Sequence, residues 1–174
     1  EFIELYNYGD ETIDLSSVAF SEGVNYTFPW GNTLSSGDRV VIVKNQDVFE
    51  SRYGTELPVA GEYTGQLSNR GETIQLNAAD GTEIARITYG DSNSPGWPVR
   101  ADGAGPSLEL VAPGEPHSDF SLPAVWKNGQ SPGGTPGSAT TILPCDFVDV
   151  GKGLIAQGFT SAGKLTASGG SAGG

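Results

Sequence analysis

Short segments that alternate apolar and polar residues, each ended by a turn sequence, run through most of this chain. In the first, residues 2–7, the even-numbered side chains would lie on one face of a strand and the odd-numbered ones on the other. Turn residues follow at 8–11, and the same order of segment and turn then repeats along the sequence. This repetition is typical of an all-β protein with antiparallel strands.

Two further patterns sharpen the prediction of strands. Residues 39–44 hold a continuous β-branched run, which favours a central strand that is covered on both faces. Residues 72–77 and 83–89 flank Asp80-Gly81, and an Asp-Gly pair between alternating segments is a strong hairpin signal. Helices through 39–44 or 83–89 would contradict the predicted fold.

One segment has a helical pattern. Residues 46–53 predict a helix of about two turns, because Val48, Phe49 and Arg52 would fall on one face. Asn45 precedes the segment and can cap its first turn.

The predicted fold class is an all-β sandwich with one short helix. We expect about eight to ten short strands, including segments at 12–15, 18–20, 25–28, 107–111 and 124–127. The composition agrees, since the chain holds 26 Gly and 11 Pro and only 17% charged residues, as a protein with many tight turns would.

The charge of the chain excludes some classes of partner. A net charge of −12 repels phosphate backbones and anionic lipid surfaces, so neither nucleic acid nor a membrane surface is an expected partner. No apolar run reaches the roughly 18 residues needed to span a bilayer, so we expect no membrane insertion. The lone cysteine, Cys145, allows no disulfide within the chain, and it is either a buried free thiol or a link between chains.

The sequence does not predict a catalytic set. His117, Ser118 and Asp119 are adjacent and cannot reach one another as a triad, so His117 is interpreted as a loop histidine. Glu4, Glu72 and Glu109 alternate with apolar residues, which predicts that they lie on outward faces of strands rather than in a pair of catalytic carboxylates. We expect no enzyme and no cofactor.

Two other groups of residues are weaker candidates for binding. Asp91, Asn93 and Asp102 lie in predicted loops and are candidate calcium ligands, although no recognised spacing links them. Trp30, Trp97 and Trp126 lie near loops, where they either pack in the core or form a contact surface for carbohydrate or protein. The sequence leaves both interpretations of the tryptophans open.

The series of motifs in residues 1 to about 139 resembles bacterial lamin-tail domains. Its parts, in chain order, are 2–7, 14–16, 26–29, 34–37, 67–72, 89–91, 97–98, 101–110 and 133–137. This resemblance implies an immunoglobulin-like β-sandwich that serves as an accessory or structural module in secreted and cell-surface proteins. Residues 140–174 have no counterpart in that family and are expected to form a Gly/Ser-rich extension with short strand-like segments.

Members of that family carry a further strand before the segment that matches residues 2–7. We therefore expect a vacant position beside this segment, with Phe2, Ile3 and Leu5 as assembly residues. Residues 154–159, with Leu154, Ile155 and Phe159, are a candidate to fill the vacancy in another copy of the chain. The alternative is that the extension folds back on its own sandwich or begins another domain.

The expected function is a non-enzymatic structural or adhesive module that lies outside the cell or on its surface. Self-association through strand exchange would make it a subunit of a filament or surface layer. The alternative is an accessory module of a larger secreted protein that binds carbohydrate or a cell-surface partner.

Overall fold

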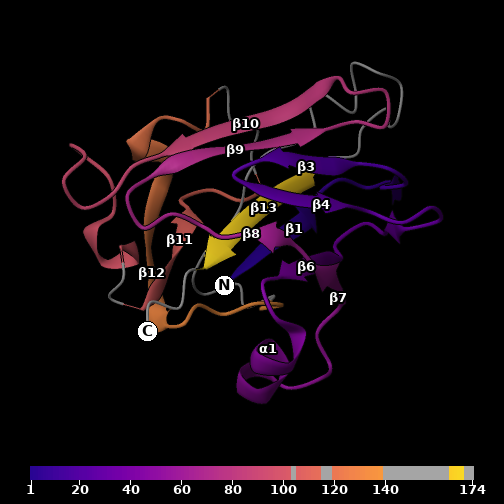
Figure 1. The fold of residues 1–174 in the computed structure, drawn as a ribbon, viewed down its shortest axis with the longest axis horizontal. Helices are drawn as coiled ribbons and strands as arrows, with labels where there is room; N and C mark the ends of the chain where they lie inside the picture. The colour runs from indigo at the N-terminus through magenta and orange to yellow at the C-terminus, as the bar shows by residue number, and fades with distance from the viewer. Residues whose placement is uncertain (103–104, 115–118, 139–164, 171–174) are drawn as a thin grey trace.

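The computed structural model describes residues 1–102, 105–114, 119–138 and 165–170, which form two sheets packed face to face (Figure 1). The apolar side chains between them make up the main hydrophobic core. Ile3, Ile42 and Leu110 enter this core from one sheet, and Phe20 and Leu76 enter it from the other. The predicted immunoglobulin-like β-sandwich is confirmed.

The first sheet has six strands, and all neighbouring pairs in it are antiparallel except the last, β6 with β7. In spatial order the strands are β12 (Trp126–Pro132), β11 (Pro106–Leu110), β13 (Leu165–Gly170), β1 (Phe2–Asn7), β6 (Arg39–Val43) and β7 (Val59–Glu62).

The second sheet has five antiparallel strands and is drawn above the first in Figure 1. In spatial order these are β10 (Glu83–Tyr89), β9 (Glu72–Asn77), β3 (Ala19–Glu22), β4 (Val24–Thr27) and β8 (Thr64–Gly65). A separate two-residue ladder joins β2 (Ile13–Asp14) to β5 (Thr33–Leu34), and two 3-10 turns are η1 (Val99–Ala101) and η2 (Pro123–Val125).

Local turn chemistry forms the predicted hairpin of β9 and β10. Asp80 Oδ1 accepts the backbone N–H of Thr82 at 2.9 Å, which fixes the turn between the two strands. Farther along the hairpin the hydroxyls of Thr73 and Thr88, a directly opposed pair, lie 2.9 Å apart. The hairpin prediction is therefore confirmed.

Helix α1 (Gln46–Tyr53) covers the outer face of the first sheet. Asn45 caps it as predicted, because Asn45 Oδ1 accepts the Val48 N–H at 2.8 Å. Phe49 is the buried residue of the helix and belongs to a second apolar cluster with Phe2, Val41 and Val43. Of the three residues predicted to share one face of the helix, Phe49 is buried, whereas Val48 is 67% exposed and Arg52 is exposed too. Phe49 and Tyr53, four positions apart, are the residues of α1 whose rings contact Phe2 of the sheet.

Residues 39–44 behave as the sequence predicts. β6 lies inside the sheet between β1 and β7, and its last three residues are buried. Thirteen strands occur in the described residues, more than the eight to ten predicted, because two-residue strands such as β5 and β8 are too short to leave a sequence pattern.

Candidate functional site: the strand slot between β1 and β11

The C-terminal strand β13 lies inside the six-stranded sheet, between two strands that are distant from it in sequence. It pairs antiparallel with β1 over six residue pairs, from Phe2 opposite Gly170 to Asn7 opposite Leu165. On its other side, Gly169 pairs with Leu108 of β11. Figure 1 shows β13 in yellow beside β1. We call the position between β1 and β11 the slot.

The slot exists because β1 is buried on both faces. Ile3 and Leu5 point into the main core, whereas Phe2 packs outward against the rings of Phe49 and Tyr53, with centroids 5.7 and 6.0 Å away. A strand covered on both faces needs hydrogen-bonding partners along both edges, since water cannot replace them. β6 pairs with one edge of β1, and β13 pairs with the other.

The outer face of this region is covered by residues 133–137, which we call the closing segment. The Tyr53 hydroxyl donates to the Gly133 carbonyl, and Arg52 Nη2 donates to the Pro132 carbonyl at 3.2 Å. At the other end of the segment, the Gly137 N–H donates to Glu4 Oε2. Helix α1 and strand β1 together therefore hold the closing segment against the sheet.

Glu4 is a buried carboxylate at the slot. Its Oε1 lies 3.2 Å from Nε of Arg39, whose guanidinium carbon lies 4.0 Å from the centre of the Tyr6 ring. Burial raises the pKa of Glu4 to about 7, against the opposing effects of the Gly137 N–H and Arg39. The ion pair therefore depends on pH near neutrality.

A second buried carboxylate, Glu109, lies on the opposite side of the slot. It accepts a hydrogen bond from Ser107 Oγ at 3.1 Å, and its Oε2 is 3.6 Å from Lys127 Nζ on the next strand. The prediction that Glu4 and Glu109 face water is wrong, since each is 1% exposed, and Glu72 is half-buried. Alternation shows which residues share a face but not whether that face is covered.

The slot offers backbone hydrogen bonds and shaped apolar surface, which suit the binding of an extended strand. A comparison with known protein families bears on the β1 side of the slot. The family model of the Lamin Tail Domain matches residues 1–91, which is 91 of the 174 residues. The chain belongs to the lamin tail domain family. No curated protein matches the sequence of this lamin tail domain chain.

The match divides the slot between two parts of the chain. β1 lies inside the matched lamin tail domain residues, whereas β11, β12 and β13 lie after residue 91. The predicted resemblance is thus confirmed, and the match itself ends at residue 91, before the predicted limit near residue 139.

The structure brings together only part of the predicted assembly set. Phe2, Ile3 and Leu5 all lie on β1 and pair with β13, whereas Leu154, Ile155 and Phe159 lie outside the described residues. The expectation of a vacancy beside residues 2–7 is not met within this one chain, because residues 165–170 occupy that position. From the sequence, the end of residues 165–170 is predicted to be a flexible linker. A run of Ala, Ser and Gly shows no alternation of apolar and polar residues that would indicate a strand.

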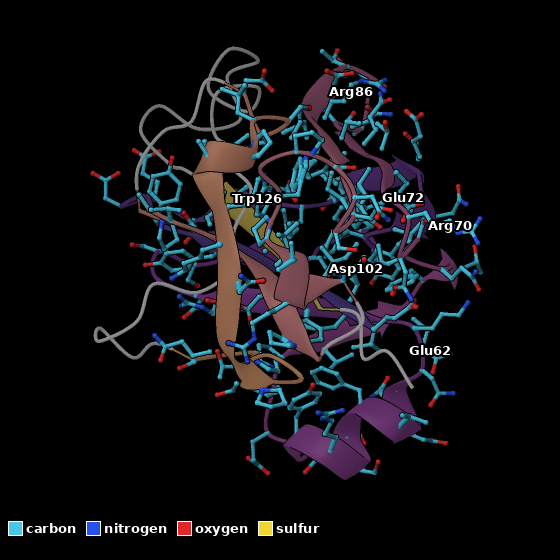
Figure 2. All side chains as sticks on the ribbon, turned by 90° about the vertical axis from the view of Figure 1, so that its left-hand side faces the viewer. Glu62, Arg70, Glu72, Arg86, Asp102 and Trp126 are labelled. Carbon is cyan, nitrogen blue, oxygen red and sulfur yellow. The ribbon has the colours of Figure 1, made fainter. Side chains whose placement is uncertain are left out.

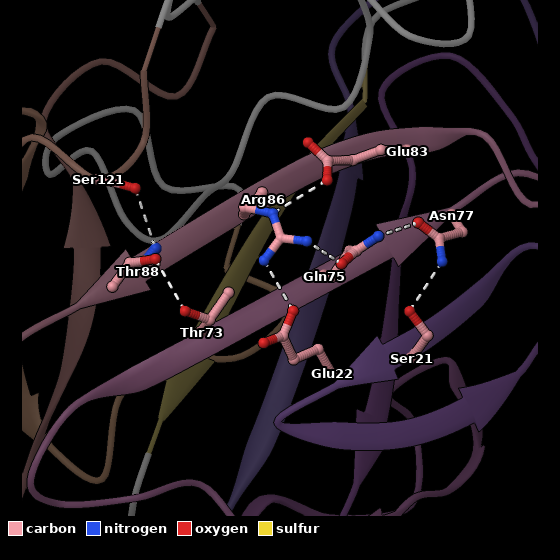
Figure 3. Close-up of polar contacts among 9 residues, drawn as sticks. All are labelled: Ser21, Glu22, Thr73, Gln75, Asn77, Glu83, Arg86, Thr88 and Ser121. Atoms are coloured by element: carbon pink, nitrogen blue, oxygen red, sulfur yellow. Dashed lines mark hydrogen bonds and ion pairs between the residues drawn. The ribbon is translucent and has the colours of Figure 1, made fainter.

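The exposed face of the second sheet carries a polar network (Figure 3). Arg86 pairs with Glu22 at 2.7 Å and with Glu83 at 3.0 Å, and it also donates to Gln75. The network continues from Gln75 through Asn77 to Ser21. These groups bond to one another across β3, β9 and β10, which stabilises the sheet surface. Other charged side chains, such as Glu62 and Arg70, project from the surface (Figure 2).

The candidate calcium ligands form hydrogen bonds within their loop. Asp91 accepts from the backbone and side-chain nitrogens of Asn93, at 3.0 and 3.1 Å, and from Ser94 Oγ at 2.9 Å. The side-chain hydrogen bonds from Asn93 and Ser94 lower the pKa of Asp91. Asp102, labelled in Figure 2, accepts the Ser92 N–H at 3.1 Å. Within the described ranges, no three His, Cys, Asp or Glu residues are grouped so that they could hold a metal ion.

The three tryptophans have different environments. Trp97 and Trp126 are buried and stacked, with ring centroids 6.4 Å apart, and Trp126 Nε1 donates to the Phe120 carbonyl at 2.7 Å. Trp30 is 87% exposed. His117 and Cys145 lie outside the described residues, so both predictions about them stay predictions.

Among the helices of the described residues, none is both long and apolar enough to cross a membrane.

Proposed function

We propose that this lamin tail domain is a non-enzymatic structural module of an extracellular or cell-surface protein, and that it joins copies of itself by exchanging β13. The observation that carries the proposal is the position of β13. A strand from the C-terminal part of the chain completes the middle of the sheet, between β1 and β11.

Exchange needs no new interface. The slot recognises backbone and register, so the same segment of a second copy would make the same hydrogen bonds. Residues 138–164 separate the closing segment from β13, and these 27 residues can span at most about 95 Å when fully extended. That reach is enough to enter a neighbouring copy.

The geometry of exchange favours an open assembly. The slot and the donated strand are different surfaces, so each copy would give a strand to one neighbour and accept one from another. Such a head-to-tail contact generates a filament unless the rotation between copies closes a ring. A net charge of −12 would keep these copies from associating elsewhere on their surfaces.

A non-enzymatic role is supported by the partners of the charged groups. The buried carboxylates Glu4 and Glu109 are paired with Arg39 and Lys127, and the exposed Arg86 network is also internally bonded. The alternative role, carbohydrate binding, would be favoured by an aligned pair of exposed tryptophans. Trp97 and Trp126 are instead buried together, and Trp30 stands apart from that pair as an exposed side chain.

Cysteine cross-linking between copies tests the proposal. Two full-length variants in a Cys145→Ser background, Tyr6→Cys and Thr166→Cys, carry thiols at directly opposed positions of β1 and β13. They are mixed, refolded together and oxidised. We expect a disulfide-linked dimer on a non-reducing gel, because the two thiols meet only if one copy donates its strand to the other.

The matched control replaces Thr166→Cys with Ala167→Cys. Residue 167 is opposite Leu5, on the other face of the sheet, so the mixture with Tyr6→Cys should give little dimer. Two results together would show that β13 stays with its own sandwich. The mixture would yield no dimer, and the Tyr6→Cys/Thr166→Cys double variant would form its disulfide only within one chain.

A further inference from the structure

Gly169 is the residue of β13 that pairs with both walls of the slot. It is opposite Ile3 of β1 and, on its other side, opposite Leu108 of β11. Ile3 is part of the main core and Leu108 packs against that core, so two large side chains flank this register on the inner face of the sheet.

The outer face is closed at the next register. A Cβ on Gly134 of the closing segment would lie 3.1 Å from Phe2 Cζ and 3.0 Å from Ser107 Oγ. Phe2 belongs to β1 and Ser107 to β11, so Gly134 bridges the two walls of the slot. Phe2 is the residue opposite Gly170, which places this closure at the Gly169-Gly170 end of β13.

The sequence of β13 matches this geometry. Its residues opposite Glu4, Ile3 and Phe2 are Ser168, Gly169 and Gly170. Glycine inside a strand is unfavourable on its own, and it often marks a point where neighbouring groups approach closely. The Gly/Ser composition of this end, which alone predicts a flexible linker, is therefore explained by the shape of the slot.

We infer that the slot selects its strand by size, and that it accepts an extended segment with small residues opposite Glu4, Ile3 and Phe2. The occupant is the Leu-Thr-Ala-Ser-Gly-Gly segment, residues 165–170, of a second copy of this chain. This inference rests on the proposed function, because it names the kind of strand that the same slot takes. Bulky strands from unrelated proteins would be excluded by the side chains of Ile3, Leu108 and Phe2.

Substitutions at residue 169 test the selection. The parent is full-length Cys145→Ser/Tyr6→Cys/Thr166→Cys, whose disulfide reports that β13 is seated. We expect Gly169→Ala to form the disulfide almost as well as the parent, whereas Gly169→Val lowers its rate of formation about tenfold or more through overpacking. Leu165→Val is the matched control within the strand, since position 165 already holds a large residue, and it should leave the rate unchanged.

A second-site substitution separates steric exclusion from general damage to folding. Leu108→Ala removes one of the two side chains that flank Gly169, so Leu108→Ala/Gly169→Val should regain most of the lost cross-linking. Equal rates for Gly169→Val and the parent, or failure of Leu108→Ala to restore any cross-linking, would overturn the inference. Circular dichroism of each variant shows whether the sandwich has folded.

The same variants distinguish the two proposals. Size selection is measured within one chain, and exchange is measured as dimer from the mixed single-cysteine variants. Dimer that forms regardless of residue 169 would refute size selection and leave the proposed function intact. If Gly169→Val slows disulfide formation within the chain but the mixture gives no dimer, strand exchange and the choice of a second copy as donor would both be refuted.

Discussion

Glu4 Oε1 lies 3.2 Å from Arg39 Nε on the neighbouring strand, and the carboxylate is only 1% exposed. Its other oxygen accepts the Gly137 N–H, so a single carboxylate connects β1, β6 and the closing segment. Loss of either partner, by movement of Arg39 or of the closing segment, would leave a poorly compensated charge away from water.

The stability of the protein should depend on pH through Glu4. Burial raises its folded pKa to about 7 from the ordinary value of 4.5, so between these values the folded state binds more protons than the unfolded state. The free energy of unfolding that Glu4 contributes is therefore fully present below about pH 4.5 and is lost as pH rises through about 7.

The measurement is urea denaturation of the parent and Glu4→Gln at pH 5 and pH 8. We expect the parent to lose about 2 kcal/mol more than Glu4→Gln over this interval, since the variant cannot titrate at this position. The comparison cancels the contributions of the other titrating groups, because the two proteins share them. Parallel pH curves for the two proteins would show that Glu4 does not titrate in this range.

Gly134→Ala should be destabilising for two separable reasons. Gly134 has a φ of 80°, which a side chain disfavours, and its new Cβ would press on Phe2 and Ser107. Gly31→Ala is the matched control, because Gly31 has a φ of 83° but a Cβ added there would meet no atom within 4 Å. We expect a loss of about 1 kcal/mol for Gly31→Ala and about 2–3 kcal/mol for Gly134→Ala in chemical denaturation. Equal losses would mean that the closing segment can move away from β1 and β11.

Phe49 and Val48 are sequence neighbours whose substitutions should differ greatly in their effect on stability. Phe49→Ala should lower the free energy of unfolding by about 3–4 kcal/mol, because its ring packs on Phe2 and Tyr53 beneath the helix. Val48→Ala, at a 67% exposed position, should change it by less than about 0.5 kcal/mol. Thermal unfolding followed by circular dichroism measures both. A large effect at Val48 would contradict the placement of α1.

Trp126→Phe should cost about 1–2 kcal/mol, because it leaves the buried Phe120 carbonyl without its indole donor. Trp30→Phe is the control and should have almost no effect on unfolding, since Trp30 is exposed. Fluorescence gives a second readout. An external quencher should remove the emission of Trp30 and leave most of that of Trp97 and Trp126; uniform quenching would contradict the burial of this pair.

Several elements could be predicted from local sequence because their causes are local. The β-branched run at 39–44 needs two covered faces, the Asp80-Gly81 pair directs a hairpin, and Asn45 caps the helix that follows it. Each depends on residues within a few positions of one another, and each is present in the structure where the sequence indicates it.

The slot depended on contacts that no local pattern encodes. Alternation placed Glu4 and Glu109 on one face of their strands, but α1 and residues 133–137 decide whether that face meets water, and these lie far away in the chain. The pairing of β13 with β1 joins residues more than 150 positions apart. A run of Ala, Ser and Gly has no periodic pattern of apolar residues from which this pairing could be predicted. The sequence by itself determined most of the strands, the turns and the family, whereas only the tertiary structure decided which strand completes the sheet, because that choice depends on the shape of the space between β1 and β11.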